Sequence, residues 1–320
     1  MTIRLLLLLA APLAFAQNGD RVIKAPANVG SIVFTADGKL VAAVCRDEKV
    51  RLWDPRTGEL KLTHGLLKGD GSITFPLGSD QLAMMGSDKK IKVRNLISGD
   101  VTKSLAPTGE TVRRISLSPD QKLVAGSSRA GSNGSEETVR VWDPSGNQLY
   151  DVPAGVGGTS VLAFSPDGER LVAGSYDTNL RAWSSRNGEL LRLIEEIPVA
   201  TFAAVFSPDG KTLATAGADR MVYLWDAKTF KLRSKLPEQP EMISALAFSP
   251  DGRLLMTGGF SVVTNRAPVK VMIWDLASRK VVRSMDAPHQ VGSVAFSGDG
   301  TLAAATSSDD QIHVWSVRGR

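Results

Sequence analysis

The sequence has little of what metal, haem or disulfide chemistry requires. Cys45 is the single cysteine, so the chain cannot form an internal disulfide, and a metal or haem site built on cysteines is excluded. The three histidines, His64, His289 and His313, are far apart, and no two of them have the spacing of metal ligands on one element. We therefore expect neither a metal ion nor a cofactor.

Signatures of catalysis and of nucleic-acid binding are missing as well. There is no G-x-S-x-G nucleophile elbow, no glycine-rich phosphate loop and no H-E-x-x-H helix. The formal net charge is +5, but Lys and Arg are scattered beside Asp and Glu without forming a basic run. These absences predict a protein that has no catalytic residues and does not bind nucleic acid.

Apolar runs of membrane-spanning length are also absent. The run at the N-terminus, Leu5–Phe15, is shorter than the about 20 residues that cross a bilayer, and no later stretch approaches that length. Arg4 precedes this run, and Ala14-Phe15-Ala16 has the small-x-small pattern that signal peptidase reads. Residues 1–16 are therefore predicted to be a signal peptide removed before Gln17. We expect the mature chain in the periplasm or outside the cell, without membrane insertion.

What the sequence does contain is a repeat. The string Phe-Ser-Pro-Asp-Gly stands at Phe164, Phe206 and Phe248, and variants of it occur in four other places. A β-branched strand ending in Trp follows, and all six tryptophans occupy this position, which Arg94 takes in the second copy. The spacing between the two anchors is 19 residues in five copies, 25 in the third and 26 in the sixth. The seven copies are centred on Phe34–Trp53, Phe75–Arg94, Leu117–Trp142, Phe164–Trp183, Phe206–Trp225, Phe248–Trp274 and Phe296–Trp315.

Each copy encodes four strands. In the fourth copy, the apolar pattern predicts strands at Ser160–Phe164, Leu171–Ser175, Leu180–Trp183 and Glu189–Leu193. The Pro-Asp-Gly sequence and Asn187-Gly188 supply the tight turns between them. One four-stranded unit cannot bury both of its faces, so the copies must pack against one another around a ring. We predict an all-β, seven-bladed propeller that forms a single domain over residues 17–320.

These residues resemble the WD40-repeat family, whose signature is a Trp-Asp pair that closes the third strand after an SPDG-type turn. The resemblance extends from about Arg21 to Val317 and suggests an exported, bacterial-type member. It implies a structural aspartate six residues before the Trp anchor, replaced by Glu136 in the third copy and Pro268 in the sixth. The implied structural anchors are Asp47, Asp88, Asp177, Asp219, Asp309, Trp53, Trp142, Trp183, Trp225, Trp274 and Trp315.

The family's Gly-His pair before the first strand is largely missing from this sequence. His289 lies in the right neighbourhood, but the other copies have no counterpart in register. In the family this histidine belongs to a buried His-Ser-Asp-Trp hydrogen-bond network. The resemblance therefore implies that only the Asp and Trp ends of the network remain here. Cys45 aligns with glycines and serines of other copies, so we expect a small buried residue rather than a reactive thiol.

Departures from the repeat indicate where a partner could bind. Residues 128–137 and 259–268 lengthen the loop between the second and third strands, and the resemblance implies that this loop lies on the rim used for partners. The Gly- and Ser-rich segment 128–137, which carries a formal glycosylation sequon at Asn133, fits a flexible insertion, whereas 259–268 fits a functional one. Arginine and large aromatic side chains dominate binding energy at interfaces. The candidate partner-binding residues are Arg46, Arg129, Tyr176, Phe260 and Arg266.

The seventh copy lacks a fourth strand, because the sequence ends at Arg320, soon after Trp315. An open three-stranded blade would expose unpaired backbone groups along its edge. Arg21–Ala25 reads as an orphan strand ahead of the first copy. We predict that this strand pairs with Gln311–Val317 and closes the ring.

Three interpretations of function remain. The first is a monomeric binding or scaffold protein that presents one propeller rim to a protein partner. The second is an enzyme resembling the propeller lactonases or quinoprotein dehydrogenases. Such an enzyme would need convergent Glu, Asp, Asn or His side chains near the central channel, where the anchor segments carry Ala, Val, Ser and Leu. The third is a subunit of an envelope complex.

Overall fold

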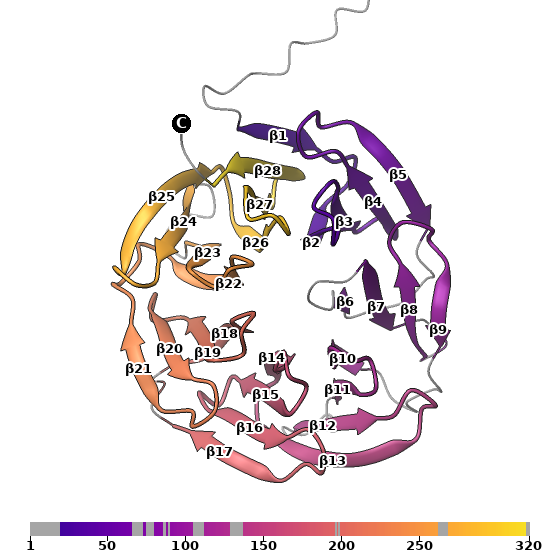
Figure 1. The fold of residues 1–320 in the computed structure, drawn as a ribbon, viewed down its shortest axis with the longest axis vertical. Helices are drawn as coiled ribbons and strands as arrows, with labels where there is room; N and C mark the ends of the chain where they lie inside the picture. The colour runs from indigo at the N-terminus through magenta and orange to yellow at the C-terminus, as the bar shows by residue number, and fades with distance from the viewer. Residues whose placement is uncertain are drawn as a thin grey trace, which may run out of the picture.

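The computed structural model describes residues 20–65, 73–74, 80–85, 88, 90–104, 112–128, 137–195, 197, 199–261 and 268–317. This part of the chain consists of β-strands joined by turns and loops, and it contains no helix that could cross a membrane. The strands form seven four-stranded antiparallel sheets, arranged as blades around a central opening (Figure 1). The predicted seven-bladed β-propeller is therefore confirmed.

In each blade the first strand named below lies at the central channel and the last one at the outer edge. Blade 1 contains β2 (Val29–Phe34), β3 (Val41–Cys45), β4 (Lys49–Trp53) and β5 (Leu60–Gly65). Blade 2 contains β6 (Ile73–Thr74), β7 (Gln81–Met85), β8 (Ile91–Asn95) and β9 (Val101–Ser104). Blade 3 contains β10 (Val112–Leu117), β11 (Val124–Ser128), β12 (Glu137–Trp142) and β13 (Gln148–Gly155).

Blades 4 to 7 repeat this order. Blade 4 contains β14 (Thr159–Phe164), β15 (Arg170–Ser175), β16 (Leu180–Ser184) and β17 (Leu190–Ile194). Blade 5 contains β18 (Thr201–Phe206), β19 (Thr212–Gly217), β20 (Val222–Asp226) and β21 (Leu232–Lys235). Blade 6 contains β22 (Met242–Phe248), β23 (Leu254–Phe260), β24 (Val269–Asp275) and β25 (Lys280–Ala287). Blade 7 contains β26 (Val291–Phe296), β27 (Leu302–Ser307), β28 (Gln311–Ser316) and, outermost, β1 (Arg21–Lys24).

The turn after each innermost strand follows from the Ser-Pro-Asp-Gly sequence. In blade 4 the Gly168 amide donates to the carbonyl of Ser165 at 2.8 Å, and Gly168 has a φ of 72° that only glycine adopts without strain. The Asp167 carboxylate accepts from the Ser165 hydroxyl at 2.5 Å and from the Glu169 amide at 3.0 Å. Asp209 is held in the same way in blade 5, and hydrogen bonds from Ser207 and from the Lys211 amide lower its pKa.

The hydrophobic core lies between neighbouring blades, and the tryptophans are buried in it. Trp225 of blade 5 packs with Leu180 and Ile194 of blade 4, and the other five tryptophans are equally enclosed, none more than 5% exposed. Arg94, which stands at the Trp position of blade 2, donates instead to the carbonyls of Gly65 and Gly99, each at 3.1 Å. Each of the core clusters between the blades therefore joins residues from two neighbouring sequence copies, as a ring of repeats requires.

Strand β1 closes the ring, as predicted. It pairs antiparallel with β28, with Arg21 opposite Val314 and Lys24 opposite Gln311. The Ala25 amide also donates to the carbonyl of Asp310 at 2.9 Å, and Asp20 forms an ion pair with Arg283 of blade 6 at 2.7 Å. The two ends of the described chain thus belong to one sheet (Figure 1).

Four of the five structural aspartates contact the residue four positions further on, inside the third strand of the same blade. Asp177 pairs with Arg181 at 2.8 Å, and Asp219 accepts from the Tyr223 hydroxyl at 2.6 Å. The remaining ion pairs of this kind are Asp47–Arg51 at 2.5 Å and Asp88–Lys92 at 2.8 Å. In blade 7 this position is His313, which stacks on Trp315 at 5.7 Å, and burial lowers the pKa of His313.

The expectation that only Asp and Trp remain of the family's buried network is wrong in two blades. The Trp225 indole donates to the Thr215 hydroxyl at 2.9 Å, and the Trp274 indole donates to Thr257 at 3.3 Å. Thr257 in turn donates to the Gln239 side chain at 2.7 Å. Gln239, from the loop that enters blade 6, therefore connects to the threonine, and a Gln-Thr-Trp chain is present in the blade where Pro268 replaces the structural aspartate.

Several sequence predictions lie outside the described residues. These are the signal peptide over 1–16, the sequon at Asn133, and the candidate residues Arg129 and Arg266. Most of the two insertions, 128–137 and 259–268, falls there too. Their ends show that they join β11 to β12 and β23 to β24.

Candidate functional site

One rim of the propeller gathers two kinds of loop, those that enter a blade and those that join its second and third strands. Backbone hydrogen bonds tie them together within a blade. The Tyr176 amide donates to the carbonyl of Gly158 at 3.2 Å, and the Ser308 amide donates to that of Gln290 at 3.0 Å. We call this the Tyr176 rim. The candidate binding residues that the structure describes, Arg46, Tyr176 and Phe260, belong to loops or strand ends of this rim.

Three aromatic side chains from adjacent blades form a row on the Tyr176 rim. The rings of Tyr176 in blade 4 and Phe202 in blade 5 are 6.2 Å apart, and those of Phe202 and Phe260 in blade 6 are 5.9 Å apart. Both distances lie in the range of favourable aromatic pairs. Tyr176 is 55% exposed, and the two phenylalanines are half-buried. We call Tyr176, Phe202 and Phe260 the aromatic row; two of its members were predicted from the sequence and Phe202 was not.

Phe202 stands at a position where five of the other six copies have glycine or serine. It stands four positions before its Phe anchor, where Ser160 and Ser244 stand in the neighbouring copies. In the structure each of these positions is a bulge at the start of an innermost strand. The Ser160 hydroxyl donates to the carbonyl of Thr201 in the next blade at 2.5 Å, and Ser244 does the same to Val291 at 3.2 Å. Phe202 cannot make this bond; comparing the copies at this position would have identified it.

The turn that carries Tyr176 is fixed by its neighbours. Its side chain lies against Gly157 and Gly158, which have φ values of 87° and 117°, and a Cβ on Gly157 would come 3.1 Å from the Tyr176 Cβ. Burial alone would raise the pKa of the adjacent Asp177, but hydrogen bonds from Arg181 and Ser175 outweigh it and the pKa is lowered. Tyr176 is therefore an exposed ring on a turn that hydrogen bonds to Asp177 and close packing hold in place.

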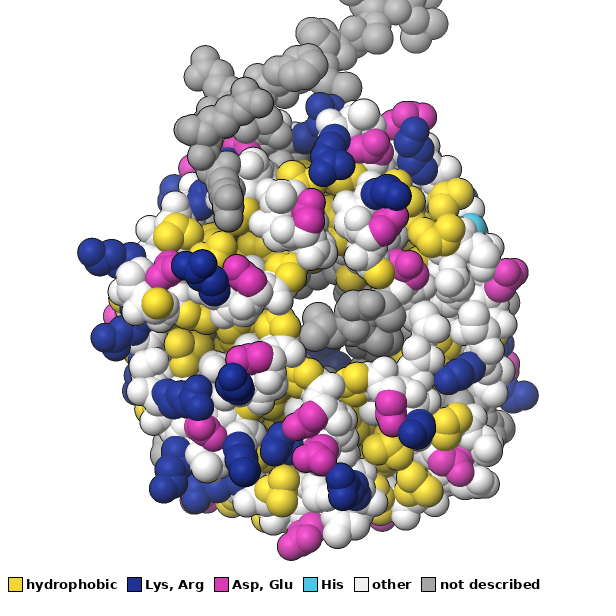
Figure 2. Space-filling view, viewed as in Figure 1, with side chains coloured by type: hydrophobic (Ala, Val, Ile, Leu, Met, Phe, Trp, Pro, Cys, Tyr) yellow, Lys and Arg dark blue, Asp and Glu magenta, His cyan; other side chains and the backbone are white. Residues whose placement is uncertain are grey.

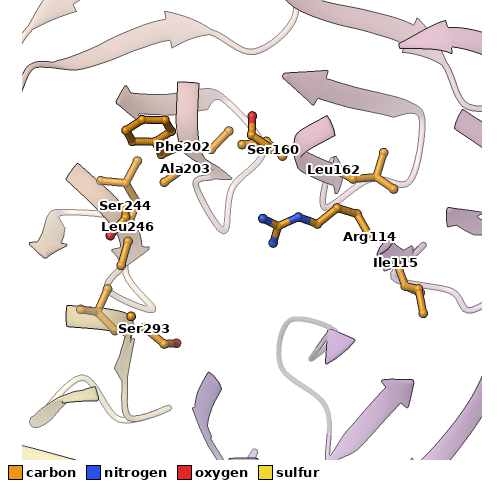
Figure 3. A pocket seen from close by; sticks show the side chains of 14 residues that line it. Arg114, Ile115, Ser160, Leu162, Phe202, Ala203, Ser244, Leu246 and Ser293 are labelled. Carbon is orange, nitrogen blue, oxygen red and sulfur yellow. The ribbon is translucent and has the colours of Figure 1, made fainter. Parts of the chain in front are cut away.

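The central channel adjoins the aromatic row. It holds a cavity of about 240 Å³ lined by the innermost strands of blades 3 to 7, and the space-filling view shows the ring hollowed at its centre (Figure 2). Phe202 belongs both to this lining and to the aromatic row. Arg114 is the one charged residue among the lining residues that the structure describes, and its guanidinium points into the opening (Figure 3).

Arg46, the remaining candidate in the described part of the chain, is separate from the aromatic row. It is exposed, and its amide donates to the carbonyl of Asn28 in blade 1 at 2.8 Å. Blade 1 lies across the ring from blades 4 and 5 (Figure 1). The structure therefore brings Tyr176 and Phe260 together, through Phe202, and leaves Arg46 apart from them.

The described residues of the aromatic row and of the channel lining offer contact surface and one cation, Arg114. Among these residues no cluster of three or more His, Cys, Asp or Glu side chains could hold a metal ion. The described lining of the channel includes serines, aliphatic residues, Phe202 and Arg114, but no carboxylate. Cys45 is buried, as expected from its alignment with small residues, and burial raises the pKa of its thiol.

Comparison with known proteins places this arrangement in context. The rat apoptotic protease-activating factor 1 is 26% identical over 174 residues, which are 53% of this chain and 13% of that protein. A Synechocystis protein described as an uncharacterized WD repeat-containing protein is 28% identical over 148 residues, 46% of this chain and 41% of that protein. Subunit I of eukaryotic translation initiation factor 3 from Coccidioides immitis is 36% identical over 182 residues, 52% of this chain and 53% of that protein.

These relatives are thus matched over only part of their own length, from 13% to 53% in the three proteins named. The family model described as WD domain, G-beta repeat matches residues 19–54, 154–184, 197–226, 230–261 and 279–316, which together make up half of the chain. With seven four-stranded blades closed by an N-terminal strand, the protein belongs to the WD40 family of β-propellers.

Proposed function

We propose that this protein is a binding or scaffold protein that docks a protein partner on the Tyr176 rim over blades 4 to 6. The observation that carries the proposal is the aromatic row, which spans three adjacent blades and is still exposed at Tyr176. WD40 proteins generally bind protein partners, and aromatic residues contribute most to binding at such interfaces.

The aromatic row has the properties of a preformed contact surface. Aromatic rings have few rotatable bonds, so they lose little conformational entropy when a partner covers them. Here the rings also contact one another, and hydrogen bonds to Asp177 hold the turn that carries Tyr176. A phenylalanine stands at position 202, where Ser160 and Ser244 of the two neighbouring copies bond to the next blade. The fold therefore gives up a hydrogen bond and gains an aromatic surface, which favours a role in binding over a role in stability.

Replacing the aromatic row is expected to weaken partner binding without unfolding the propeller. Tyr176→Ala, Phe260→Ala and Phe202→Ser should each reduce capture of the partner about tenfold, as truncation of an interface aromatic does. Phe202→Ser introduces the residue that Ser160 and Ser244 already have in the same bulge, so it should leave the melting temperature unchanged. Quantitative pull-down from the envelope fraction, with thermal melts of each variant, provides the measurement.

Leu190→Ala is the matched control for these variants. Leu190 is 54% exposed, close to the 55% of Tyr176, but it lies on the outer strand of blade 4 rather than on the rim. This change should leave capture intact. If Leu190→Ala weakened capture as much as Tyr176→Ala, or if the rim variants melted at clearly lower temperatures, the rim would not be the docking surface.

We further propose that the protein acts outside the cytoplasm. Arg4, the apolar run Leu5–Phe15 and the Ala14-Phe15-Ala16 pattern support export by a signal peptide. The protein recovered from its native cell should therefore begin at Gln17, with or without cyclisation to pyroglutamate. Intact-mass and N-terminal peptide measurements check this, and accumulated protein beginning at Met1 or Thr2 would rule out the proposal.

A further inference from the structure

Arg114 is an unusual residue for its place in the fold. It stands three positions before the anchor of its copy, where the six other copies have uncharged residues: Ser31, Ser72, Val161, Ala203, Ala245 and Ser293. Its side chain is exposed in the central channel (Figure 3). Arg114 makes no ion pair with any described residue, although most charged side chains of the turns are paired. The other described residues of this lining are uncharged, and a cation beside uncharged residues concentrates its field on whatever enters the channel.

Arg114 lies near the Tyr176 rim in its strand. Arg114 pairs with Ser127, one residue before β11 ends and the loop of that rim begins. Phe202 is likewise the second residue of β18, at the same end of its blade, and it lines the same channel. Arg114 and the aromatic row therefore belong to one continuous surface, which a single ligand could cover. We call this surface the channel mouth.

Hydrogen-bond donors at the channel mouth favour an anionic group. The hydroxyls of Ser160 and Ser244 are already used, because each donates to a backbone carbonyl of the next blade. Ser293 differs, since its oxygen accepts from the Ile32 amide at 3.3 Å and its own hydrogen remains available. Arg114 adds the donors of a planar fork that matches a carboxylate. The described lining thus offers the guanidinium of Arg114 and the hydroxyl of Ser293 as donors. It contains no carboxylate that would compete with a ligand for them.

The size of the cavity narrows the class of ligand. Its volume of about 240 Å³ is below the range of roughly 300–1,000 Å³ found for small-molecule pockets. A single acidic side chain or a chain terminus fits such a space, while the neighbouring residues of the same peptide would lie on the aromatic row. The geometry therefore favours a peptide that inserts one group over a free metabolite that fills the site alone.

We propose that the channel mouth binds a carboxylate of a protein partner, an Asp or Glu side chain or a C-terminus, with Arg114 as its ion-pair partner. The aromatic row receives the apolar residues beside that carboxylate. This inference rests on the proposed function, because the docked partner supplies the acidic group. It adds the chemical class of ligand that the rim selects.

Peptide arrays test the proposal even before a partner has been identified. Dodecapeptides with degenerate flanks carry Glu, Gln or Lys at a fixed central position, and the labelled full-length protein is the probe. We expect at least tenfold more capture on Glu-centred than on Gln-centred peptides, the difference that charge-assisted hydrogen bonds make. Arg114→Gln should abolish this preference, and Arg114→Glu should reverse it towards Lys-centred peptides. Equal capture on the three arrays would overturn the proposal.

Two controls separate this result from non-specific charge effects and from loss of fold. Lys228→Glu makes the same change in charge in the turn between β20 and β21, on the opposite rim, and should keep the wild-type preference. Melting temperatures of the Arg114 variants should equal that of the wild type, because the side chain faces an open channel. A loss of Glu preference in Lys228→Glu as well would attribute the effect to net charge and contradict the assignment to Arg114.

Two further experiments distinguish a peptide carboxylate from a free one, and the carboxylate proposal from the proposal of docking on the rim. Calorimetry with 3-phenylpropionate alone should show weak binding; affinity equal to that of the best peptide would make this a small-carboxylate site and overturn the peptide assignment. If Tyr176→Ala loses capture while Arg114→Gln keeps the full Glu preference, rim docking stands and the carboxylate proposal fails. If Arg114→Gln loses the Glu preference while Tyr176→Ala keeps full capture, the channel binds peptides and docking on the aromatic row fails.

Discussion

Deleting residues 17–27 is expected to destabilise the whole propeller, because it removes the outer strand of blade 7. The deletion takes away Ile23 and Ala25, which are buried against Ile312 and Val314, and the backbone pairing of β1 with β28. Burial of an isoleucine contributes about 2–3 kcal/mol and each backbone hydrogen bond about 1 kcal/mol. The expected loss is therefore about 5 kcal/mol of unfolding free energy, a large share of what holds a domain folded.

Point variants of the same strand separate its core contacts from mere loss of chain length. Ile23 is 3% exposed and Val22, next to it, is 40% exposed, because neighbouring side chains of a strand point to opposite faces. Ile23→Asp should therefore reproduce much of the effect of the deletion, since it buries an unpaired charge. Val22→Asp, which makes the same chemical change on the outer face, should leave the melting temperature nearly unchanged.

The deletion should also change the state of association. Without β1, strand β28 becomes an unpaired edge, and such edges pair with other chains. Chemical denaturation measures the stability, and size-exclusion chromatography with light scattering measures the association. A truncated protein that remained monomeric and had the same melting temperature as the full-length chain would contradict the role of the β1–β28 pairing in closing the ring.

The repeat allowed most of the fold to be predicted from the sequence. Its period located seven blades, and the strands expected in the fourth copy have ends within one residue of β14 to β17. The missing fourth strand of the last copy led directly to the role of Arg21–Lys24. Period and patterning suffice here because each copy meets the same physical problem, two apolar faces that only its neighbours can cover.

The candidate site was only half predictable, because it arises from contacts between copies. Tyr176 and Phe260 were identified as large residues at rim positions, but their connection through Phe202 depends on how blades 4, 5 and 6 pack. Phe202 and Arg114 escaped notice since both lie in strands that otherwise follow the repeat. They become visible when equivalent positions of the innermost strands are compared, where a bulky or charged residue replaces a small or uncharged one.

The buried network shows the opposite error, an expected loss that did not occur. Without the family's histidine, the sequence suggested that only Asp and Trp remained. Thr215 and Thr257 nevertheless accept from the indoles of Trp225 and Trp274, and Gln239 accepts from Thr257. A glutamine in a loop has no periodic signal, so only the three-dimensional contact identifies it as a substitute.

Trp225→Ala is expected to be among the most damaging single substitutions in the chain. The side chain is fully buried between blades 4 and 5, stacks on Tyr223 at 5.8 Å and donates to Thr215 at 2.9 Å. Truncating a buried tryptophan costs about 3–5 kcal/mol. For a propeller of this length, the melting temperature should fall by roughly 5–8 °C, as measured by calorimetry.

Thr215→Val divides this loss into packing and hydrogen bonding. It preserves the volume beside the ring but removes the acceptor, which leaves the buried indole N–H without a partner and costs about 1–3 kcal/mol. Trp225→Phe should cost more than Thr215→Val, because it loses both the bond and part of the ring that is buried in one core cluster with Leu180 and Phe230. If Thr215→Val were neutral while Trp225→Ala unfolded the protein, packing alone would hold the tryptophan, and the network would contribute no stability. The ordering expected from the contacts is Trp225→Ala, then Trp225→Phe, then Thr215→Val, each less stable than the wild type.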